Sequence, residues 1–241
     1  RSIAVESRPV GQDEEEMSVA GADRDLTPLA SVGLGQARSG PVRSQRPVYV
    51  DLLPPCNAGC PAGENIQAWL ALVKSGKPEA AWRQLTLDNP FPAIHGRVCY
   101  HPCEAACNRV ELDGAVSIHE VERFLGDQAI EHGWAFDQPP PATGHRVLVV
   151  GSGPSGLAAA YHLVRLGHGV TVRDVGAEPG GMMRYGIPTY RLPRSVLDAE
   201  SDRLRILGVV IEQGHRVEDL AAEMRDGPFD AVFVAVGAHL S

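Results

Sequence analysis

The sequence predicts two domains of different class, α + α/β: a small helical domain followed by a doubly wound α/β domain. Apolar residues recur with helical spacing between residues 46 and 138, and an apolar run at 145–150 leads directly into a glycine turn. Between them lies Pro139-Pro140-Pro141, and consecutive prolines form a stiff linker. We therefore expect a flexible lead at 1–45, the helical domain at 46–138, a linker at 139–144 and the α/β domain at 145–241.

The α/β domain begins with a strand, a glycine turn and a helix. In Gly151-x-Gly153-x-x-Gly156 the first glycine turns the chain, the second lets the backbone approach a pyrophosphate, and the third lets the helix pack on the strand. A second strand, Val170–Val172, is followed by Asp174, where an acid can bind a ribose hydroxyl. This pattern predicts a dinucleotide site, the alternative being an ordinary glycine-rich turn. We expect its phosphates at the helix N-terminus, which offers free N–H groups.

The rest of this domain is expected to complete a parallel sheet. We predict a helix at 195–207, a short strand at 209–211 and a short helix at 219–224, then a strand at 230–237 buried on both faces. Residues 180–193 contain too many glycines and prolines for a regular element. Such a loop, placed after the second strand, can contact a ligand.

Three helices are expected in the first domain. One spans Asn65 to Lys74, and another begins at Pro78, since proline suits a first helical turn. A third begins at Ser117, which forms a capping box with Glu120. The apolar residues that share a face on these helices are Ile66, Trp69, Leu70 and Val73, then Trp82 and Leu85, and then Ile118, Val121, Leu125 and Ala129.

Five cysteines form two groups, Cys56-x3-Cys60-Pro61 and Cys99-x3-Cys103-x3-Cys107. An odd number of clustered cysteines, without an export signal, favours metal ligation over disulfides. A helix beginning at Pro102 would place Cys103 and Cys107 on one face, with Cys99 approaching from the preceding loop. Converging thiolates can hold an iron–sulfur cluster. Zinc and five inert buried thiols are the alternatives.

Glu122 is expected in the apolar stripe of the helix that begins at Ser117, rather than on its wet face. A buried carboxylate needs a partner. A metal centre would provide one. An Arg or Lys partner, or a more exposed helix, is the alternative.

Composition limits the partners and the location. With 30 acidic and 22 basic residues the chain has no basic stripe for nucleic acid, and it contains neither an apolar run long enough for a membrane span nor a signal segment. We expect a cytoplasmic protein. The chain begins at Arg1, so we expect a piece of a longer or processed chain. Residues 1–45, with the acidic run 13–16, show no lasting apolar periodicity, as in a flexible tether.

Four motifs in a fixed order carry a family resemblance: Cys56-Asn-Ala-Gly-Cys-Pro61, Gly96-Arg-Val-Cys-Tyr-His-Pro-Cys-Glu-Ala-Ala-Cys107, the glycine turn at 151–156, and Tyr185-Gly-Ile-Pro-Thr-Tyr-Arg-Leu-Pro193. The chain from about residue 46 resembles the small (beta) subunit of glutamate synthase. It is also similar to the amino-terminal part of dihydropyrimidine dehydrogenase and to the large subunit of NADH-dependent ferredoxin:NADP oxidoreductase. The resemblance implies a helical iron–sulfur domain followed by the first part of a Rossmann-like FAD-binding domain.

The resemblance also implies where the nucleotides bind. A second glycine motif, for NAD(P)H, should follow Gly237 and therefore lie outside these residues, as should the remainder of the FAD domain. The residues implied at or along FAD are Gly151, Gly153, Pro154, Ser155, Gly156, Asp174, Gly181, Arg184, Tyr185, Gly186, Ile187, Arg191 and Gly237. No catalytic residue is implied.

Two [4Fe-4S] clusters share their ligands crosswise in the family that the sequence resembles. One set corresponds to Cys60, Cys99, Cys103 and Glu122. The other corresponds to Cys56 and Cys107 with two upstream cysteines, whose positions hold Val48 and Asp51 here. Valine cannot ligate iron, so we expect one cluster.

The resemblance thus implies a subunit that moves electrons between NAD(P)H, FAD, the cluster and a partner. The partner would be a larger redox or synthase subunit, or a ferredoxin, in a hetero-oligomer. A single-component FAD oxidoreductase without a working cluster is one alternative. A non-catalytic scaffold of a larger redox complex is the other.

Overall fold

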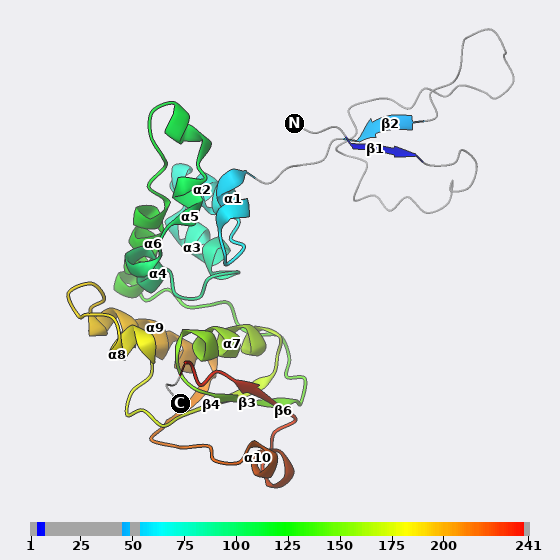
Figure 1. The fold of residues 1–241 in the computed structure, drawn as a ribbon, viewed down its shortest axis with the longest axis vertical. Coiled ribbons are helices and arrows are strands. Elements are labelled where there is room, and N and C mark those ends of the chain that lie inside the picture. The colour runs from blue at the N-terminus through cyan, green and yellow to red at the C-terminus, as the bar shows by residue number, and fades with distance from the viewer. Residues whose placement is uncertain (1–3, 8–44, 49–53, 239–241) are drawn as a thin grey trace, which may run out of the picture. The chain divides into compact units, whose positions relative to one another are not determined.

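A computed structural model describes residues 4–7, 45–48 and 54–238 (Figure 1). The chain divides into two units, residues 1–52 and residues 53–241. In the first, β1 (Ala4–Ser7) pairs with β2 (Gln45–Val48) in antiparallel fashion. The remainder of the predicted flexible lead lies outside the described residues, and so does Asp51.

Short helices fill the first part of the second unit. They are α1 (Pro55–Gly59), α2 (Ile66–Lys74), α3 (Pro78–Thr86), α4 (Pro92–Val98), α5 (Pro102–Ala105), the 3₁₀ helix η2 (Asn108–Glu111) and α6 (Ile118–His132). Proline opens α1, α3, α4 and α5, where its missing N–H has no intrahelical partner to lose. Fully buried Trp69, Trp82 and Leu125 form the core between α2, α3 and α6. The predicted helices at Asn65 and Pro78 are confirmed.

Helices α4 and α6 cross with their backbones in contact. A Cβ atom on Gly96 of α4 would lie 2.4 Å from the backbone nitrogen of Arg123, and one on Gly126 of α6 would lie 2.2 Å from the nitrogen of Ala93. Only glycine allows this approach at either position. Because Cys99 is the residue that ends α4, the crossing sets where its thiol lies relative to α6.

The capping box predicted at Ser117 is wrong. Ser117 precedes α6 but its side chain accepts no cap hydrogen bond. Instead the Glu104 carboxylate accepts the backbone N–H of His119 at 2.9 Å. A carboxylate is the stronger acceptor at a helix N-terminus because it also complements the helix dipole.

The expected helical pair Cys103 and Cys107 is also wrong. Helix α5 is a single turn that ends at Ala105, and the backbone of Cys107 is extended (φ −70°, ψ 123°) before η2 begins. The two thiols therefore do not share one helix face. The extended residue lets the chain change direction between the two short helices.

The second part of this unit is an α/β layer. Its elements are β3 (Arg146–Val150), α7 (Pro154–Arg165), β4 (Gly169–Asp174), α8 (Met182–Tyr185), α9 (Arg194–Leu207), β5 (Val210–Gln213), α10 (Leu220–Asp226) and β6 (Ala231–Val234). The four strands are parallel, in the order β5-β4-β3-β6. Helix α7 lies on one side of the sheet and α10 on the other (Figure 1). Accordingly Val149 packs in one core cluster, whereas Leu148 and Val150 pack in the other.

Two expectations in this layer need correction. The loop at 180–193 contains one helical turn, α8, because Gly180 and Gly181 take positive φ and start it. The strand at 230–237 is not buried on both faces. It is the edge strand β6, and Phe233 and Val234 are 41% and 52% exposed. An edge strand has a hydrogen-bonded neighbour on one side only.

The helical part and the α/β layer are joined by polar contacts from α7 and α9. The Tyr161 hydroxyl donates to the carbonyl of Thr86 at 2.6 Å. Fully buried Glu200 accepts the N–H of Ala93, in the first turn of α4, at 3.2 Å, and thereby caps a helix that has no cap of its own. The guanidinium of Arg203 lies over the ring of Trp82, 5.1 Å from its centroid. These contacts fix the start of the helix that ends at Cys99.

We expect Gly96→Ala to lower the free energy of unfolding by about 2–3 kcal/mol, because the clash with backbone outweighs a helix-propensity gain of about 1 kcal/mol. Chemical denaturation measures it. Gly169→Ala is the control, since a Cβ there meets its nearest atom at an ordinary 3.6 Å. Equal stabilities for Gly96→Ala and the control would contradict the tight crossing.

A second prediction concerns pH. Burial raises the pKa of Glu200 from 4.5 to about 7, although Arg203 and Arg97 oppose it, with Asp127 adding to the rise. Between pH 4.5 and about 7 the folded state holds a proton that the unfolded state has lost, so the free energy of unfolding should fall by about 3 kcal/mol as pH rises through this range. Glu200→Gln, which keeps an acceptor for Ala93, should lack this component. Urea titrations of both proteins at pH 5 and pH 7.5 test it, and parallel pH profiles would contradict it.

Candidate functional site

Three of the predicted ligands, Cys60, Cys99 and Cys103, gather where α1 meets α5. A Cβ on Gly59, beside Cys60, would lie 3.6 Å from the Cα atom of Cys103. Burial, with the nearby charges of Cys60 and Cys99, raises the pKa of the Cys103 thiol to about 12. The Cys99 sulfur accepts the N–H of His101 at 3.4 Å. Cys103 is buried, whereas Cys60 and Cys99 are only partly buried.

Cys60 lies in the turn that follows α1, where its environment favours the protonated thiol. Burial raises the pKa of Cys60, and the backbone N–H groups of Ala62, Gly63 and Glu64 oppose that rise. The remaining two cysteines, Cys56 and Cys107, lie at other positions around the short helices α1 and α5. The Cys56 thiol donates to the side chain of Asn57 at 3.7 Å, and Cys107 follows α5. All five are free thiols.

Glu122 is buried on α6, as its place in the apolar stripe predicted. The structure does not place it against a cysteine. Its Oε1 accepts from Asn89 Nδ2 at 2.6 Å, and the same nitrogen donates to Oε1 of Glu64 at 2.9 Å. Burial raises the pKa of Glu64 to about 6 and that of Glu122 well above its usual value, each with help from a neighbouring carboxylate.

These two carboxylates have no cation beside them. Among the described residues, neither Glu64 nor Glu122 forms an ion pair with Lys or Arg. The nearby His95 is neutral, because burial lowers its pKa to about 4. Buried carboxylates without a counter-charge are costly. The raised pKa values lower this cost, because they favour the protonated, neutral form of both groups. Cys60, Cys99 and Cys103 have the thiol chemistry of iron–sulfur ligands, whereas Glu122 is bonded to Asn89.

Within the described ranges, no three His, Cys, Asp or Glu side chains converge closely enough to hold a single metal ion. The missed residues of this site are Glu64 and Asn89. Glu64 lies in a loop, outside any periodic stripe, so only its nearness to Cys60 in the sequence could have indicated it. Asn89 precedes Pro90 and resembles an ordinary turn residue.

The glycine turn has room for a ligand at one position only. A Cβ on Gly151 (φ +107°) would lie 2.3 Å from the carbonyl oxygen of Ala235, and one on Gly156 would lie 1.9 Å from that of Gly151. A Cβ on Gly153 would meet only the Cα atom of Gly181, at 4.0 Å. Gly153 therefore faces open space, where Pro154 and Ser155 begin α7 and are exposed.

Asp174, the last residue of β4, ties the turn to the neighbouring strand. Its Oδ2 accepts the backbone N–H of Ser152 at 2.5 Å and the Ser152 hydroxyl at 2.7 Å. Its Oδ1 accepts the N–H of Gly176 at 2.6 Å. A carboxylate has about four lone-pair sites, so one acceptor position remains for a ribose hydroxyl.

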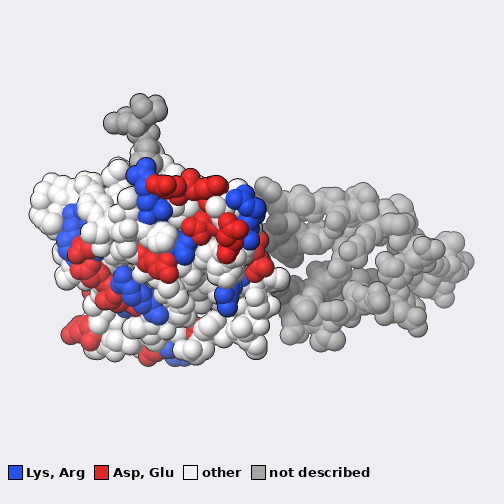
Figure 2. Space-filling model, turned by 90° about the horizontal axis from the view of Figure 1, so that it is seen from below, with Lys and Arg blue, Asp and Glu red and all other residues white. Residues whose placement is uncertain are grey.

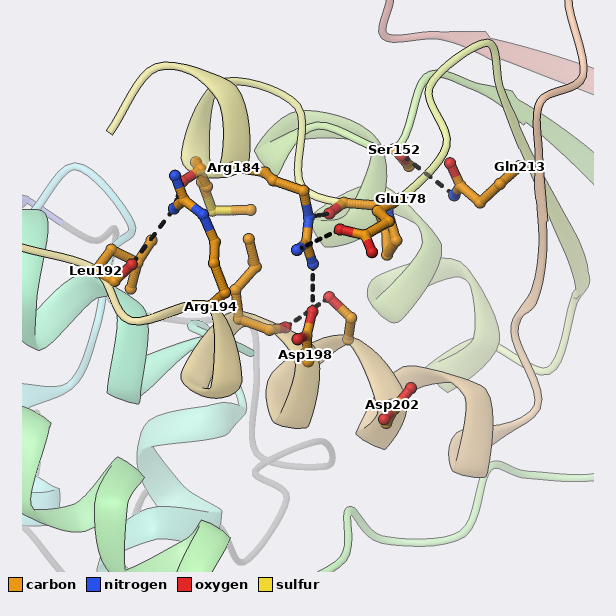
Figure 3. Close-up of polar contacts among 12 residues, drawn as sticks. Ser152, Glu178, Arg184, Leu192, Arg194, Asp198, Asp202 and Gln213 are labelled. Carbon is orange, nitrogen blue, oxygen red and sulfur yellow. Dashed lines mark hydrogen bonds and ion pairs between the residues drawn. The ribbon is translucent and has the colours of Figure 1, made fainter. Parts of the chain in front are cut away.

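The loop at 180–193 packs on the same turn. The N–H of Gly180 donates to the Ser152 carbonyl at 2.8 Å. Arg184 is buried inside the loop, where it donates to the Pro179 carbonyl at 2.6 Å and pairs with Glu178 and Asp198 (Figure 3). Arg184 therefore stabilises the folded conformation of the loop. Arg194, which the sequence did not single out, also stabilises this loop. Its guanidinium donates hydrogen bonds to the carbonyls of Leu192, Met183 and Ile187.

The other predicted residues of this region lie at the surface. Tyr185, Gly186, Arg191 and Gly237 are exposed, and Ile187 is half-buried. A hollow of about 240 Å³ joins Arg191 and Tyr190 to the cysteine segment. Its other walls include His101 and His119, whose rings stack with centroids 3.8 Å apart. The loop at 180–193 and the segment that carries Cys99 and Cys103 therefore border one cavity.

The surface carries both signs of charge. Figure 2 shows Asp and Glu side chains interspersed with Lys and Arg on the face that it views. None of the described helices combines the length and the apolar character needed to cross a membrane.

Comparison with known protein families identifies the domain type of the helical part and of the α/β layer. Residues 44–134 match the family described as dihydropyrimidine dehydrogenase domain II, 4Fe-4S cluster, and residues 149–200 match the NAD(P)-binding Rossmann-like domain. The chain thus combines a helical iron–sulfur domain with a Rossmann-like dinucleotide-binding region, and the predicted fold class is confirmed.

Three curated proteins are similar to more than three quarters of this chain. The chain is 42% identical over 188 residues to the glutamate synthase [NADPH] small chain of Mycobacterium tuberculosis (strain ATCC 25618 / H37Rv), covering 77% of this chain and 38% of the relative. It is 33% identical over 210 residues to the NADP(+)-dependent formate dehydrogenase subunit beta of Moorella thermoacetica, covering 78% and 30%. The NADPH-Fe(3+) oxidoreductase subunit beta of Geobacter sulfurreducens (strain DL-1 / KN400) is 38% identical over 191 residues, with 78% and 28% covered.

The chain spans less than two fifths of the length of these relatives. The predicted resemblance to the glutamate synthase small subunit and to dihydropyrimidine dehydrogenase is confirmed by these matches.

Proposed function

We propose that this chain is the iron–sulfur and flavin part of an NAD(P)H-linked electron-transfer oxidoreductase. The observation that carries the proposal is the shared hollow: Tyr190 and Arg191, from the loop packed on the glycine turn, line it together with Gly96, Arg97 and His101, which flank Cys99 in the chain. A dinucleotide held at the turn would thus have its loop beside a cluster held by the cysteines.

In this proposal the glycine turn binds FAD rather than the nicotinamide nucleotide. Gly153 admits the pyrophosphate, the first turn of α7 presents N–H groups to it, and Asp174 orients the adenosine ribose. The family match names NAD(P), which shares this mode of binding, so the choice of FAD rests on the resemblance in motif order. FAD can accept one hydride, which carries two electrons, and pass these electrons on one at a time, as a [4Fe-4S] cluster requires.

Cys60, Cys99, Cys103 and Glu122 would hold the cluster. The backbone N–H groups that face Cys60 stabilise a thiolate there, and burial of Cys103 keeps water from its sulfur. Relatives named as a small chain or a beta subunit support a larger partner subunit, hence a hetero-oligomer. We propose that this partner receives the electrons, and that the domain boundaries are those expected from the sequence.

We expect Gly153→Val to abolish flavin binding and leave the fold intact, because the added side chain occupies only the open space in front of Gly153. Flavin released from the denatured full-length protein measures binding, and its chromatographic identity separates FAD from a nicotinamide nucleotide. Gly156→Val is the contrast, since its Cβ meets backbone and should unfold the layer. A Gly153→Val protein with the normal amount of flavin would remove Gly153 from the site.

We expect one cluster, about four irons per chain. Cys60→Ser, Cys99→Ser and Cys103→Ser should each lose it, whereas Cys56→Ser and Cys107→Ser should keep it. Anaerobic iron and sulfide analysis with EPR of the reduced protein measures the content. Finding about eight irons, or losing the cluster in Cys56→Ser but not in Cys60→Ser, would overturn the ligand assignment.

A further inference from the structure

Ser152, between the first two glycines of the turn, connects the turn to three other segments of the α/β layer. It is fully buried. Its backbone N–H and its hydroxyl both donate to Oδ2 of Asp174, at 2.5 and 2.7 Å, and its carbonyl accepts the N–H of Gly180 at 2.8 Å. The side chain of Gln213, the last residue of β5, reaches the Ser152 hydroxyl oxygen at 3.4 Å (Figure 3). Ser152 thus links the turn with β4, with β5 and with the loop at 180–193.

The direction of these side-chain hydrogen bonds follows from what each group can donate. An ionised carboxylate only accepts, so the single hydroxyl proton of Ser152 points at Asp174. The hydroxyl oxygen of Ser152 is then left with its lone pairs, and only the NH2 group of the Gln213 amide can donate to it. The donors therefore run in one direction, from Gln213 through Ser152 to Asp174.

This direction leaves the other half of the Gln213 amide without a partner. Its Oε1 is buried and accepts no hydrogen bond from any described residue. Turning the amide over would place Oε1 against the lone pairs of the Ser152 hydroxyl and would remove the one bond that the side chain makes. Since a buried acceptor without a partner is destabilising, a gain in folding stability does not account for a glutamine at this position.

We propose that Gln213 is a positioning residue for the dinucleotide, acting on Asp174 through Ser152. The inference rests on the proposed function, because it assumes that Asp174 binds the adenosine ribose of FAD. A serine hydroxyl can rotate between staggered positions. While Gln213 donates to its oxygen, the Ser152 hydroxyl keeps the orientation in which it donates to Oδ2 of Asp174.

This orientation decides which carboxylate oxygen of Asp174 remains open to a ligand. Oδ2 accepts both donors of Ser152, whereas Oδ1 accepts only the N–H of Gly176, at 2.6 Å. Each carboxylate oxygen has about two lone pairs, so the open one is on Oδ1. If the Ser152 hydroxyl turned away, Oδ2 would also have an open lone pair, and the carboxylate could present either oxygen. Gln213 thus makes Oδ1 the acceptor for the ribose hydroxyl.

FAD affinity and folding stability together separate this role from a packing role. Gln213→Met keeps a side chain of similar length but has no donor. We expect the dissociation constant of FAD from the full-length apoprotein, measured by flavin fluorescence, to rise about fivefold, the factor that corresponds to a net hydrogen bond of about 1 kcal/mol. The urea midpoint of the apoprotein should not fall, because the unpaired acceptor is removed with the donor. Gln138→Met, at an exposed position before the linker, is the control and should change neither quantity.

A double-mutant cycle tests the route through Ser152. Ser152→Ala removes the hydroxyl that links the other two side chains, so adding Gln213→Met to it should weaken FAD binding no further. Additive effects of the two changes, an unchanged dissociation constant in Gln213→Met, or a fall in its apoprotein stability equal to the loss of FAD affinity would each overturn the role of Gln213 alone. Wild-type protein that binds no FAD would overturn the proposed function, and this inference with it.

Discussion

Backbone contact between α4 and α6, at Gly96 and Gly126, is the constraint on which the cysteine site depends. Packed helices usually have their axes 8–10 Å apart, depending on the side chains at the contact, and here even a Cβ atom at either glycine would collide with the facing backbone. The close approach leaves Asn89, just before α4, within reach of Glu122, while Cys99 follows the other end of α4. Moving the helices apart would separate the amide of Asn89 from the carboxylate of Glu122.

Neither of these helices supplies its own N-terminal cap. Glu104, from the cysteine segment, caps α6, and Glu200, from the α/β layer, caps α4. Each cap is long-range, so the ends of the two helices are fixed by residues that must already be packed against them. The helix that ends at a predicted cluster ligand therefore begins on the dinucleotide-binding layer.

The sequence was sufficient where apolar periodicity or the spacing of glycines determines the local structure. The stripe through Ile66 and Trp69 predicted α2, and the spacing of Gly151 and Gly156 predicted a turn that packs a helix onto a strand. The sequence was insufficient where a residue far along the chain determines the local structure. Ser117 has the right local pattern for a cap, yet a carboxylate brought near by tertiary packing takes its place.

The same limit explains the candidate site. Burial of Glu122 followed from its helical position, but its bond to Asn89 depends on how two helices cross. The expected burial of the last strand failed because strand order, not composition, decides which strand lies at the edge. Arg184 looked like a ligand residue from its loop, and only the folded loop shows Glu178 and Asp198 around it.

The contacts of Tyr161 with Thr86 and of Glu200 with Ala93 have a thermodynamic consequence. Because they join the two halves through buried hydrogen bonds, we expect the halves to unfold in one cooperative transition. A ligand that binds only the folded chain at either half would then raise the free energy of unfolding of both halves.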